Sequence, residues 1–318
     1  MKKNILIGTD NAGKRVDKFL KEEVFFNLEI SRGEITENIK KGKVLVNDKE
    51  VKPSYVLRKD DQIELDFDPE KKQEIVPNLN LEIPIIHEDE NIIVINKPAG
   101  IRVHMDSQEM KNTLVNFLVA RYPGIEKIHD ESRDAWMRPG IVHRLDMDTS
   151  GIIVIARNEK TFLELKRQFQ SKEVEKKYAA IVYGKLDEKE GVIEKSLARA
   201  STYKKQVIAT RKTKTKVREA ITHYKVIQEL GDYTLLEVSP KTGRMHQIRV
   251  HLASIGHPIV GDERYLLKDM KEKEFRRNGR HLLHAKSIRF DLFGQSYFFE
   301  TELPLDFLAF LDETQIKR

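Results

Sequence analysis

The chain has 318 residues, 39% of them hydrophobic and 34% charged, and no apolar run approaches the roughly 18 residues that suggest a membrane span. It contains no cysteine, which excludes disulfides, thiol nucleophiles and cysteine-based zinc sites. A net charge of +6 and an isoelectric point near 9.1 fit a polyanionic partner, although many basic proteins bind no nucleic acid. The apolar run at 5–8 is too short for a secretory signal, so we expect a cytoplasmic protein of two domains with no membrane segment.

Residues 1–68 predict a small domain of two short helices followed by a sheet that contains a hairpin. Apolar residues recur at helical spacing in 13–28, Ser31 is an N-cap candidate for the second helix, and an Asn-Asp turn follows the apolar run 44–46. This segment carries 14 Lys and Arg against 14 Asp and Glu, so the positive excess lies in 69–318 (43 against 37). Charged helix faces are solvated by default, and RNA binding here would depend on clustered cations.

Residues 69–82 mix acids, lysines and prolines with little periodicity, which predicts a linker. The second domain, 83–318, shows strand and helix patterns in turn. Strands are expected at 92–96, 153–156, 178–184, 233–238, 288–292 and 296–299, and helices at 112–122, 162–169 and 245–255.

A charged turn at 143–152 runs directly into the branched aliphatic run 153–156, which predicts a buried strand. Asp146 therefore lies at the edge of a core. A carboxylate that a cation keeps ionised there is a candidate nucleophile or base. The alternative is a solvated loop with an Arg-Asp pair, and the residues of this turn alone favour that alternative.

The helix predicted at 245–255 offers a cation for such a carboxylate. Ile248 and Leu252 belong to its buried stripe. Arg249 lies next to that stripe, where a guanidinium needs a carboxylate to offset its desolvation. Asp146 and Arg249 are therefore a chemically sensible pair.

Three other residues have both a functional and an ordinary interpretation. Lys97 opens a Pro-containing turn after a buried strand, where it is either a phosphate contact or an exposed turn lysine. Tyr178 opens a strand, where a tyrosine is usually a core residue. Trp136, the one tryptophan, is by type more often packed than stacked on a base.

Residues 203–218 form the strongest basic run of the chain and include no acid. Backbone phosphates are the natural partner of such a run. The alternating lysines in 212–216 also suit the outer face of an edge strand that is guarded against aggregation. The cations of the run are Lys204, Lys205, Arg211, Lys212, Lys214, Lys216 and Arg218.

Four stretches in chain order resemble the RluA family of RNA pseudouridine synthases. They are Asn-Lys-Pro-Ala-Gly at 96–100, His-Arg-Leu-Asp-x-x-Thr-Ser-Gly at 143–151, Lys-Tyr-Ala at 177–179 and Thr-Gly-Arg-Met-His-Gln-Ile-Arg-Val-His at 242–251. The first domain resembles the small RNA-binding domain named after ribosomal protein S-four. The resemblance implies an α+β fold, with a mixed, mainly antiparallel β-sheet and flanking helices and loops in the catalytic domain, plus a small N-terminal α/β RNA-binding domain.

The resemblance also assigns roles to residues. It implies that Asp146 is the catalytic carboxylate, that Arg249 keeps it ionised and oriented, and that Tyr178 stacks on the target uracil and takes part in proton transfer. The implied substrate contacts are Arg144, which fills the space left by the flipped-out base, Ile248 and Leu252, which line the pocket, and Lys97. The implied RNA contacts are Arg15, Lys18, Arg32, Lys43, Lys204, Lys205, Arg211, Lys212 and Lys214, with Arg133, Trp136 and Arg138 as further candidates.

The implied reaction converts uridine to pseudouridine; no atoms enter or leave, so no cofactor is expected. His246, His251 and His257 suggest a metal, but the family uses none, and we expect no metal site. An N-terminal RNA module joined to this catalytic arrangement resembles the RluD and RluC branch. The expected substrate is therefore 23S ribosomal RNA of the large subunit or its precursor, modified by a monomer. Transfer RNA is the alternative substrate, and a non-catalytic ribosome assembly factor, which the intact catalytic set disfavours, is the alternative class.

Overall fold

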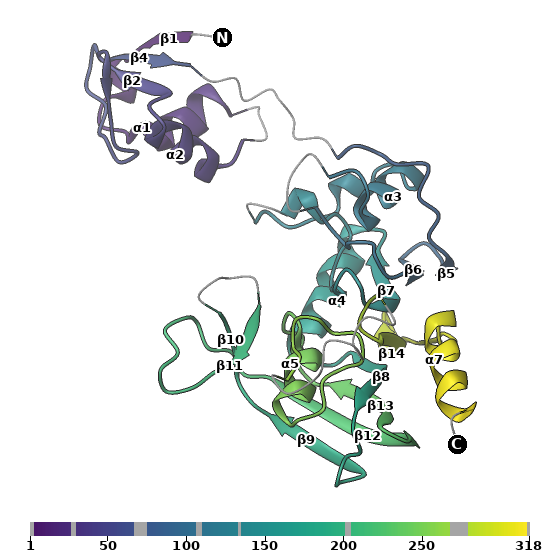
Figure 1. Cartoon of the computed structure of the whole chain (residues 1–318). Helices are drawn as coiled ribbons and strands as arrows, with labels where there is room; N and C mark the ends of the chain where they lie inside the picture. The colour runs from purple at the N-terminus through teal and green to yellow at the C-terminus, as the bar shows by residue number, and fades with distance from the viewer. Residues whose placement is uncertain are drawn as a thin grey trace. The chain divides into compact units, whose positions relative to one another are not determined.

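A computed structural model describes residues 3–26, 30–66, 75–105, 110–132, 135–200, 205–267 and 279–316 (Figure 1). Contacts divide the chain into two compact units, Met1–Glu74 with Glu131–Asp134, and Ile75–Asp130 with Ala135–Arg318. None of the helices in the described ranges is both long and apolar enough to cross a membrane.

The first unit packs short helices against a sheet of four described strands. Strands β1 (Lys3–Leu6), β4 (Gln62–Leu65), β2 (Val44–Val46) and β3 (Lys49–Glu50) lie in that order and pair antiparallel. The helical part comprises η1 (Thr9–Asn11), α1 (Val16–Phe19), η2 (Leu20–Val24) and α2 (Arg32–Lys40). This matches the predicted helices and hairpin, while β1 is a strand that the sequence patterns did not predict.

Local side-chain chemistry explains where these elements begin and turn. The Ser31 hydroxyl accepts a hydrogen bond from the backbone N–H of Glu34 (3.1 Å), so it caps α2 as predicted. Asn47 and Asp48 have φ of 51° and 61°, the left-handed pair that a two-residue hairpin turn requires.

The second unit is built on a mainly antiparallel sheet, as the resemblance implies. Its strands run in the order β5-β6-β7-β14-β8-β13-β12-β9, with β15 also on β14, and among the described pairs only β7 and β14 are parallel. The strands are β5 (Ile85–Glu88), β6 (Ile92–Lys97), β7 (Ser150–Ala156), β8 (Glu175–Tyr183), β9 (Glu190–Glu194), β12 (Ile221–Leu230), β13 (Tyr233–Pro240), β14 (Leu283–Leu292) and β15 (Gln295–Glu300).

Helices cover this sheet in two core regions (Figure 1). One core packs α3 (Leu114–Arg121) and α4 (Glu159–Ser171) against β6 and β7. The other packs α5 (Gln247–Ser254) and α7 (Leu305–Ile316) against β8 and β13. Strands β10 (Leu197–Arg199) and β11 (Gln206–Ile208) form a separate antiparallel pair outside this sheet. Two short 3-10 helices, η3 (Ile125–Lys127) and η4 (Ala135–Met137), also lie outside it.

Two strand boundaries differ from the prediction. Strand β7 begins at Ser150, inside the predicted turn, because Gly151 (φ +113°) lets the backbone of β14 approach it. A Cβ on Gly151 would lie 2.3 Å from the carbonyl oxygen of Ala285, so only glycine fits this parallel pairing. Strand β8 begins at Glu175, three residues before Tyr178.

One alternative interpretation of the surface is wrong. Residues 212–216 are not the edge strand of the alternative interpretation, because strand β11 ends at Ile208 and the lysines that follow lie in an exposed turn.

Part of the predicted linker belongs to the second unit. Asn78 donates to the backbone oxygen of Lys111 (2.8 Å), and Asn116 donates to that of Val76 (2.8 Å). Ile75 is buried beside Met105. Residues 75–82 therefore pack on the second unit, residues 69–74 lie outside the described residues, and the division at 68 and 83 stays a prediction.

Candidate active site

A pocket of about 540 Å³ opens in the second unit and brings together Asp146, Tyr178 and Arg249, which lie far apart in the sequence. The loop before β7, the start of β8, and the turn into α5 supply its walls. Among the residues that the structure describes, its lining contains many cations and a single carboxylate, that of Asp146. The cations are Arg138, Arg144, Lys166, Lys172, Lys176, Lys241, Arg244 and Arg249.

The predicted contact between Asp146 and Arg249 is present, and a second carboxylate supports it. The Nη1 of Arg249 donates to Oδ2 of Asp146 (2.9 Å). The Nε and Nη2 of the same guanidinium donate to Asp262 (2.6 and 2.8 Å) in a bidentate pair. Arg249 and Asp262 are buried, whereas the Asp146 side chain keeps 17% of its exposure. Asp146 is thus the end of this charge network that faces the pocket.

The surroundings keep Asp146 ionised. Burial alone would raise its pKa, but the electrostatic interactions with His246 and with the Arg249 guanidinium, together with the Arg249 hydrogen bond, outweigh burial and lower the pKa. Burial disfavours the charge of Arg249, yet its bonds to Asp262 and Asp146 raise the Arg249 pKa above the ordinary value. The carboxylate therefore stays deprotonated at neutral pH in a partly dry site.

A glycine places Asp262 beneath Arg249. Gly261 has φ +79°, and a Cβ there would lie 1.9 Å from the carbonyl oxygen of Arg280. No other residue fits this close backbone approach. The turn after α5 is thereby fixed with Asp262 facing the helix.

His246 approaches the same carboxylate from the start of α5. Its Nε2 lies 3.8 Å from Oδ2 of Asp146, and its Nδ1 lies 2.7 Å from Oη of Tyr265. His246 has φ 56°, which is why α5 begins at Gln247 and not at Met245 as predicted.

Tyr178 lines the pocket and is partly buried. Burial, and then the negative charge of Asp146, raise the pKa of its hydroxyl. The phenol is therefore protonated at neutral pH, and its ring face is available as a wall of the pocket.

The loop that carries Asp146 is anchored by neutral histidines. The His143 ring stacks on Phe169 (4.5 Å between centroids), and its Nε2 accepts the backbone N–H of Val154 (2.9 Å). Burial and the nearby charge of Lys176 lower the His143 pKa to about 3, so the ring stays neutral. On the other side of Asp146, Thr149 bonds to His281, whose pKa burial lowers to about 3.

The phosphate contact predicted for Lys97 is wrong in this fold. Its side chain is fully buried, and its ammonium donates to the backbone oxygens of Pro98, Ile101 and Met147 (2.8 to 2.9 Å). Lys97 instead fastens its turn to the loop of Asp146.

Of the other three predicted substrate residues, two line the pocket and one does not. Ile248 lines the pocket, and exposed Arg144 lies at it with Nη1 2.7 Å from Nε2 of His104. Leu252 does not line the pocket, because it is fully buried in the core behind α5. Leu283 of β14 supplies apolar lining in its place.

In the first unit, a buried acid organises two of the predicted RNA contacts. Asp17 is 3% exposed and accepts hydrogen bonds from Arg15 (3.0 Å) and from Arg32 (3.0 and 3.2 Å). Burial alone would raise the Asp17 pKa, but these two arginines lower it. Lys18 pairs weakly with Glu22, and Lys43 is exposed.

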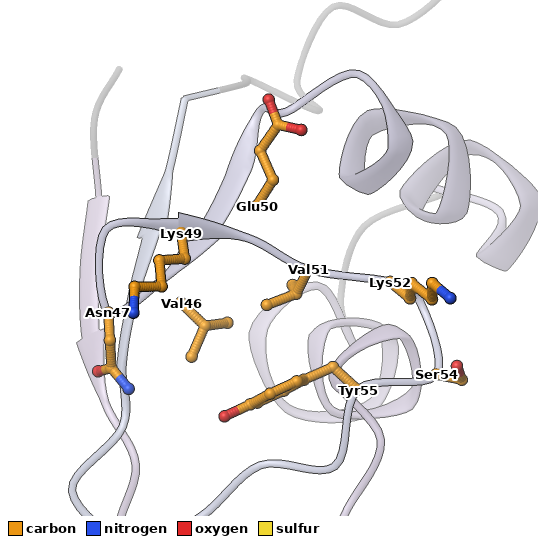
Figure 2. Close-up of a pocket in the computed structure, with 8 residues that line it drawn as sticks. All are labelled: Val46, Asn47, Lys49, Glu50, Val51, Lys52, Ser54 and Tyr55. Atoms are coloured by element: carbon orange, nitrogen blue, oxygen red, sulfur yellow. The ribbon is translucent and has the colours of Figure 1, made fainter.

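The first unit also has a shallow pocket of about 520 Å³ beside the β2–β3 hairpin (Figure 2). Figure 2 shows the Tyr55 ring lying near the side chains of Val46 and Val51. The Tyr55 hydroxyl donates to Asp61 (3.1 Å), so it is already used within the fold. This pocket lacks the concentration of cations found in the second unit.

The predicted basic run is exposed where it is described. Lys205 lies on the surface directly before β11, and Arg211, Lys212 and Lys214 lie on the surface after it. Lys204 and Arg133 lie outside the described residues. Trp136 packs beside Met105 and Val115, as expected for a tryptophan by type, and Arg138 lines the pocket of the second unit.

The three histidines considered for a metal do not converge. His251 is buried and bonds to Thr222 and to the backbone of Lys195, and His257 bonds to the backbone of Tyr183. The described residues contain no cluster of three or more His, Cys, Asp or Glu side chains that could hold a metal ion.

Comparisons with known proteins agree with this geometry. The family model for RNA pseudouridylate synthases matches residues 91–254, and that for the S4 domain matches 14–63. An RNA pseudouridine synthase of Chlorobaculum parvum is 37% identical over 94% of this chain and 93% of its own length. The chain belongs to the RNA pseudouridine synthase family.

Other relatives of this synthase carry more specific names. Ribosomal large subunit pseudouridine synthase D of Borreliella burgdorferi is 37% identical over 93% of this chain and 88% of its own, and the namesake of Pseudomonas aeruginosa is 32% identical over 94% and 92%. The structure of human RNA pseudouridylate synthase domain containing 1 is 27% identical, with a TM-score of 0.59 over 75% of this chain and 89% of that one.

Sequence patterns missed several residues of the synthase pocket. Asp262 and Tyr265 follow α5 in a turn that carries no periodic signal, and only the demand of Arg249 for a counter-charge pointed to a residue such as Asp262. Three further cations of the pocket lie inside or beside the family motifs but were not predicted as site residues: Lys176, Lys241 and Arg244. Counting the cations next to the motifs that supply Asp146, Tyr178 and Arg249 would have identified them.

Proposed function

We propose that this synthase isomerises specific uridines of 23S ribosomal RNA in the large subunit, with Asp146 as the catalytic carboxylate acting on a flipped-out uridine. The observation that carries the proposal is a single ionised carboxylate, held by Arg249, in a pocket whose other charged lining residues, among those the structure describes, are cations. Polyanionic backbone phosphates suit that lining. A pocket of about 540 Å³ lies within the usual range for small-ligand sites and suits one nucleoside.

The reaction requires little more than what the pocket offers. The bond from ribose to the ring nitrogen breaks, the uracil turns, and a bond to carbon forms, so the site must hold a detached base and exclude water. Asp146 supplies the nucleophilic or proton-accepting oxygen, and Arg249 keeps it ionised without taking its proton. Tyr178 supplies a wall against which the uracil stacks and a group for proton transfer. Because a stacked uridine is out of reach, the base must leave the helix.

Like-charge crowding in the pocket supports an anionic partner. Burial and the charge of Lys241 lower the pKa of Lys176 to about 8. Backbone phosphates placed between such cations would relieve this repulsion. In this proposal, Arg144, which lines the pocket, occupies the gap that an extruded base leaves in the RNA.

The choice of ribosomal RNA rests on the relatives named ribosomal large subunit pseudouridine synthase D and on the S4 domain. The proposal includes structured RNA of the large subunit or its precursor as partner, a monomeric enzyme and a cytoplasmic location. Transfer RNA is the competing substrate. To decide between them, pseudouridines are mapped by carbodiimide-dependent reverse-transcription stops in cells with and without this protein. If every ribosomal RNA pseudouridine remains in the cells that lack the protein, the proposal is overturned.

The Asp146→Asn variant tests the chemical role. We expect it to abolish isomerisation while RNA affinity stays within about tenfold, or about 1.4 kcal/mol, because the amide is nearly isosteric. Single-turnover conversion and RNA binding are measured on the same preparation. Affinity lost together with activity would contradict a purely chemical role.

A further inference from the structure

We propose that His246, held by Tyr265, is a positioning residue for Asp146: it restrains Oδ2 of the carboxylate and leaves Oδ1 for the substrate. The inference rests on the proposed function, since it concerns the orientation of the same carboxylate. It adds a residue pair that the motif comparison leaves without a role.

The backbone of His246 is held in an uncommon conformation. Its φ of 56° and ψ of 18° lie in the left-handed region, which is uncommon for residues other than glycine, although asparagine, aspartate and histidine adopt it more often than the rest. The surrounding contacts keep it there: the His246 carbonyl accepts the N–H of Val250 (3.0 Å), the first such bond of α5, and its ring packs edge-on against Tyr265 (5.6 Å between centroids, 79°). A strained backbone in a pocket is a feature that functional sites retain.

The hydrogen bonds around Tyr265 determine where the imidazole proton lies. The Tyr265 hydroxyl oxygen accepts the backbone N–H of Gln206 (2.9 Å), so its own hydrogen is free to point at Nδ1 of His246. Burial raises the pKa of Tyr265 to about 12, so that hydrogen is retained at neutral pH. Burial also lowers the pKa of His246, against the opposing pull of Asp146. The neutral ring therefore carries its proton on Nε2, the nitrogen that faces Asp146.

Both partners of the carboxylate approach the same oxygen. Arg249 donates to Oδ2 of Asp146 at 2.9 Å, and Nε2 of His246 lies 3.8 Å from that oxygen. No hydrogen bond within the described part of the chain reaches Oδ1. Two groups thus lie against one oxygen, and the other has no hydrogen-bond partner among the described residues.

Tyr265 also connects His246 to strand β11 through hydrogen bonds. Gln206 begins β11, and Tyr265 packs with Ile208 of the same strand in a small core with Leu197 and Val250. Strand β11, which lies within the basic run 203–218, and the imidazole at Asp146 therefore share one hydroxyl group. A shift of β11 would be transmitted to His246 through a single side chain.

Two conservative variants separate positioning from packing. His246→Asn suits the left-handed backbone and keeps an amide where Nδ1 sits, but nothing replaces Nε2. Tyr265→Phe keeps the ring and removes the hydroxyl. We expect each to slow single-turnover conversion about 10- to 100-fold at saturating enzyme, as a misplaced catalytic group does. RNA affinity is expected to stay within about threefold, which is about half of the 1.4 kcal/mol that a tenfold change represents.

A double variant and a matched control complete the test. Because the two residues act as one unit, His246→Asn with Tyr265→Phe should be no slower than the slower single variant. Tyr297→Phe removes another buried tyrosine hydroxyl, bonded to Asp89 outside the pocket, and should convert RNA at the wild-type rate.

The outcomes are distinct. Wild-type rates in both single variants, or rate losses that multiply in the double variant, would overturn the positioning role. Equal losses of affinity and rate would overturn it in favour of a structural role. If the wild-type protein itself converts no uridine, the proposed function fails. That result is distinct from the outcomes for the variants, which are all measured relative to an active wild type.

Discussion

Buried aspartates organise arginines in both units, but with opposite results. In the first unit, Asp17 holds Arg15 and Arg32, whose side chains remain about half exposed (48% and 53%). In the second unit, Asp262 holds Arg249, which is itself buried and donates through Nη1 to Asp146.

The difference shows how one interaction serves two tasks. An exposed guanidinium that is fixed by a buried carboxylate presents a pre-oriented cation to a phosphate. A buried guanidinium that is fixed the same way presents a carboxylate, because its leftover donor selects the rotamer and charge of Asp146. Removing the buried acid should therefore cost stability and chemistry in the second unit, and RNA affinity in the first.

The largest effect is expected at Asp262. Asp262→Asn keeps the shape but leaves the buried charge of Arg249 with one carboxylate instead of two, and breaking a buried pair costs about 3–5 kcal/mol. Urea unfolding measures the free energy of unfolding. Glu173→Gln, at an exposed ion pair with Arg167, is the control and should leave the unfolding curve unchanged. Equal curves for the two variants would contradict the assigned importance of the buried pair.

Arg249→Lys should change the chemistry more than the fold. A lysine keeps the positive charge, but it cannot donate in a fork to Asp262 and also reach Asp146. Since Arg249 lowers the pKa of Asp146, weakening the contact raises that pKa, so the carboxylate becomes protonated at higher pH and the acid limb of the rate profile moves upward. The pH dependence of single-turnover conversion measures this. A lower rate with an unmoved acid limb would show that Arg249 orients Asp146 without tuning its charge.

Asp17→Ala sharpens the other side of the comparison. It frees Arg15 and Arg32 from their shared anchor, and we expect RNA to bind up to about tenfold more weakly, or about 1.4 kcal/mol, with an unchanged single-turnover rate. The variant gains net positive charge, so general electrostatics predicts the opposite sign. Glu22→Gln, at the exposed pair with Lys18, adds the same charge without freeing an arginine. Tighter binding in both variants would mean that the anchor has no role in RNA binding.

Sequence patterns predicted those parts of the site that depend on residues close together in the chain. The apolar stripe of α5 placed Arg249 beside a core, and a desolvated guanidinium demands a carboxylate, so the contact with Asp146 followed from chemistry and the motif. The fold class followed from the motif resemblance, and strand and helix periodicity predicted where several of its elements lie. Strand boundaries failed where a distant backbone decides them, as at Gly151, whose neighbour Ala285 lies on another strand.

Nonlocal packing explains the errors. Leu252 and Ile248 share one helical stripe, so periodicity cannot tell which of them faces the pocket and which faces the core. The turn after α5 brings Tyr265 back to His246, a closure that depends on tertiary structure. In the sequence, Lys97 looks like an exposed lysine at a turn. One of the three carbonyl oxygens that accept hydrogen bonds from its ammonium is that of Met147, in a loop 50 residues later in the chain.

Lys97 extends the comparison to a buried cation that is held by carbonyl oxygens instead of a carboxylate. Burial lowers its pKa to about 7, opposed by the negative charges of Asp148 and Asp146, while an unfolded lysine titrates near 10.4. Between these values the unfolded chain binds more protons, so this residue makes the folded state more stable as pH rises, and that gain is lost as pH falls through 7. The slope is at most about 1.4 kcal/mol per pH unit. Urea unfolding from pH 7 to 9 should therefore show stability rising in the wild type and a flatter trend in Lys97→Met, and parallel trends would mean that the three carbonyl oxygens keep the ammonium charged throughout.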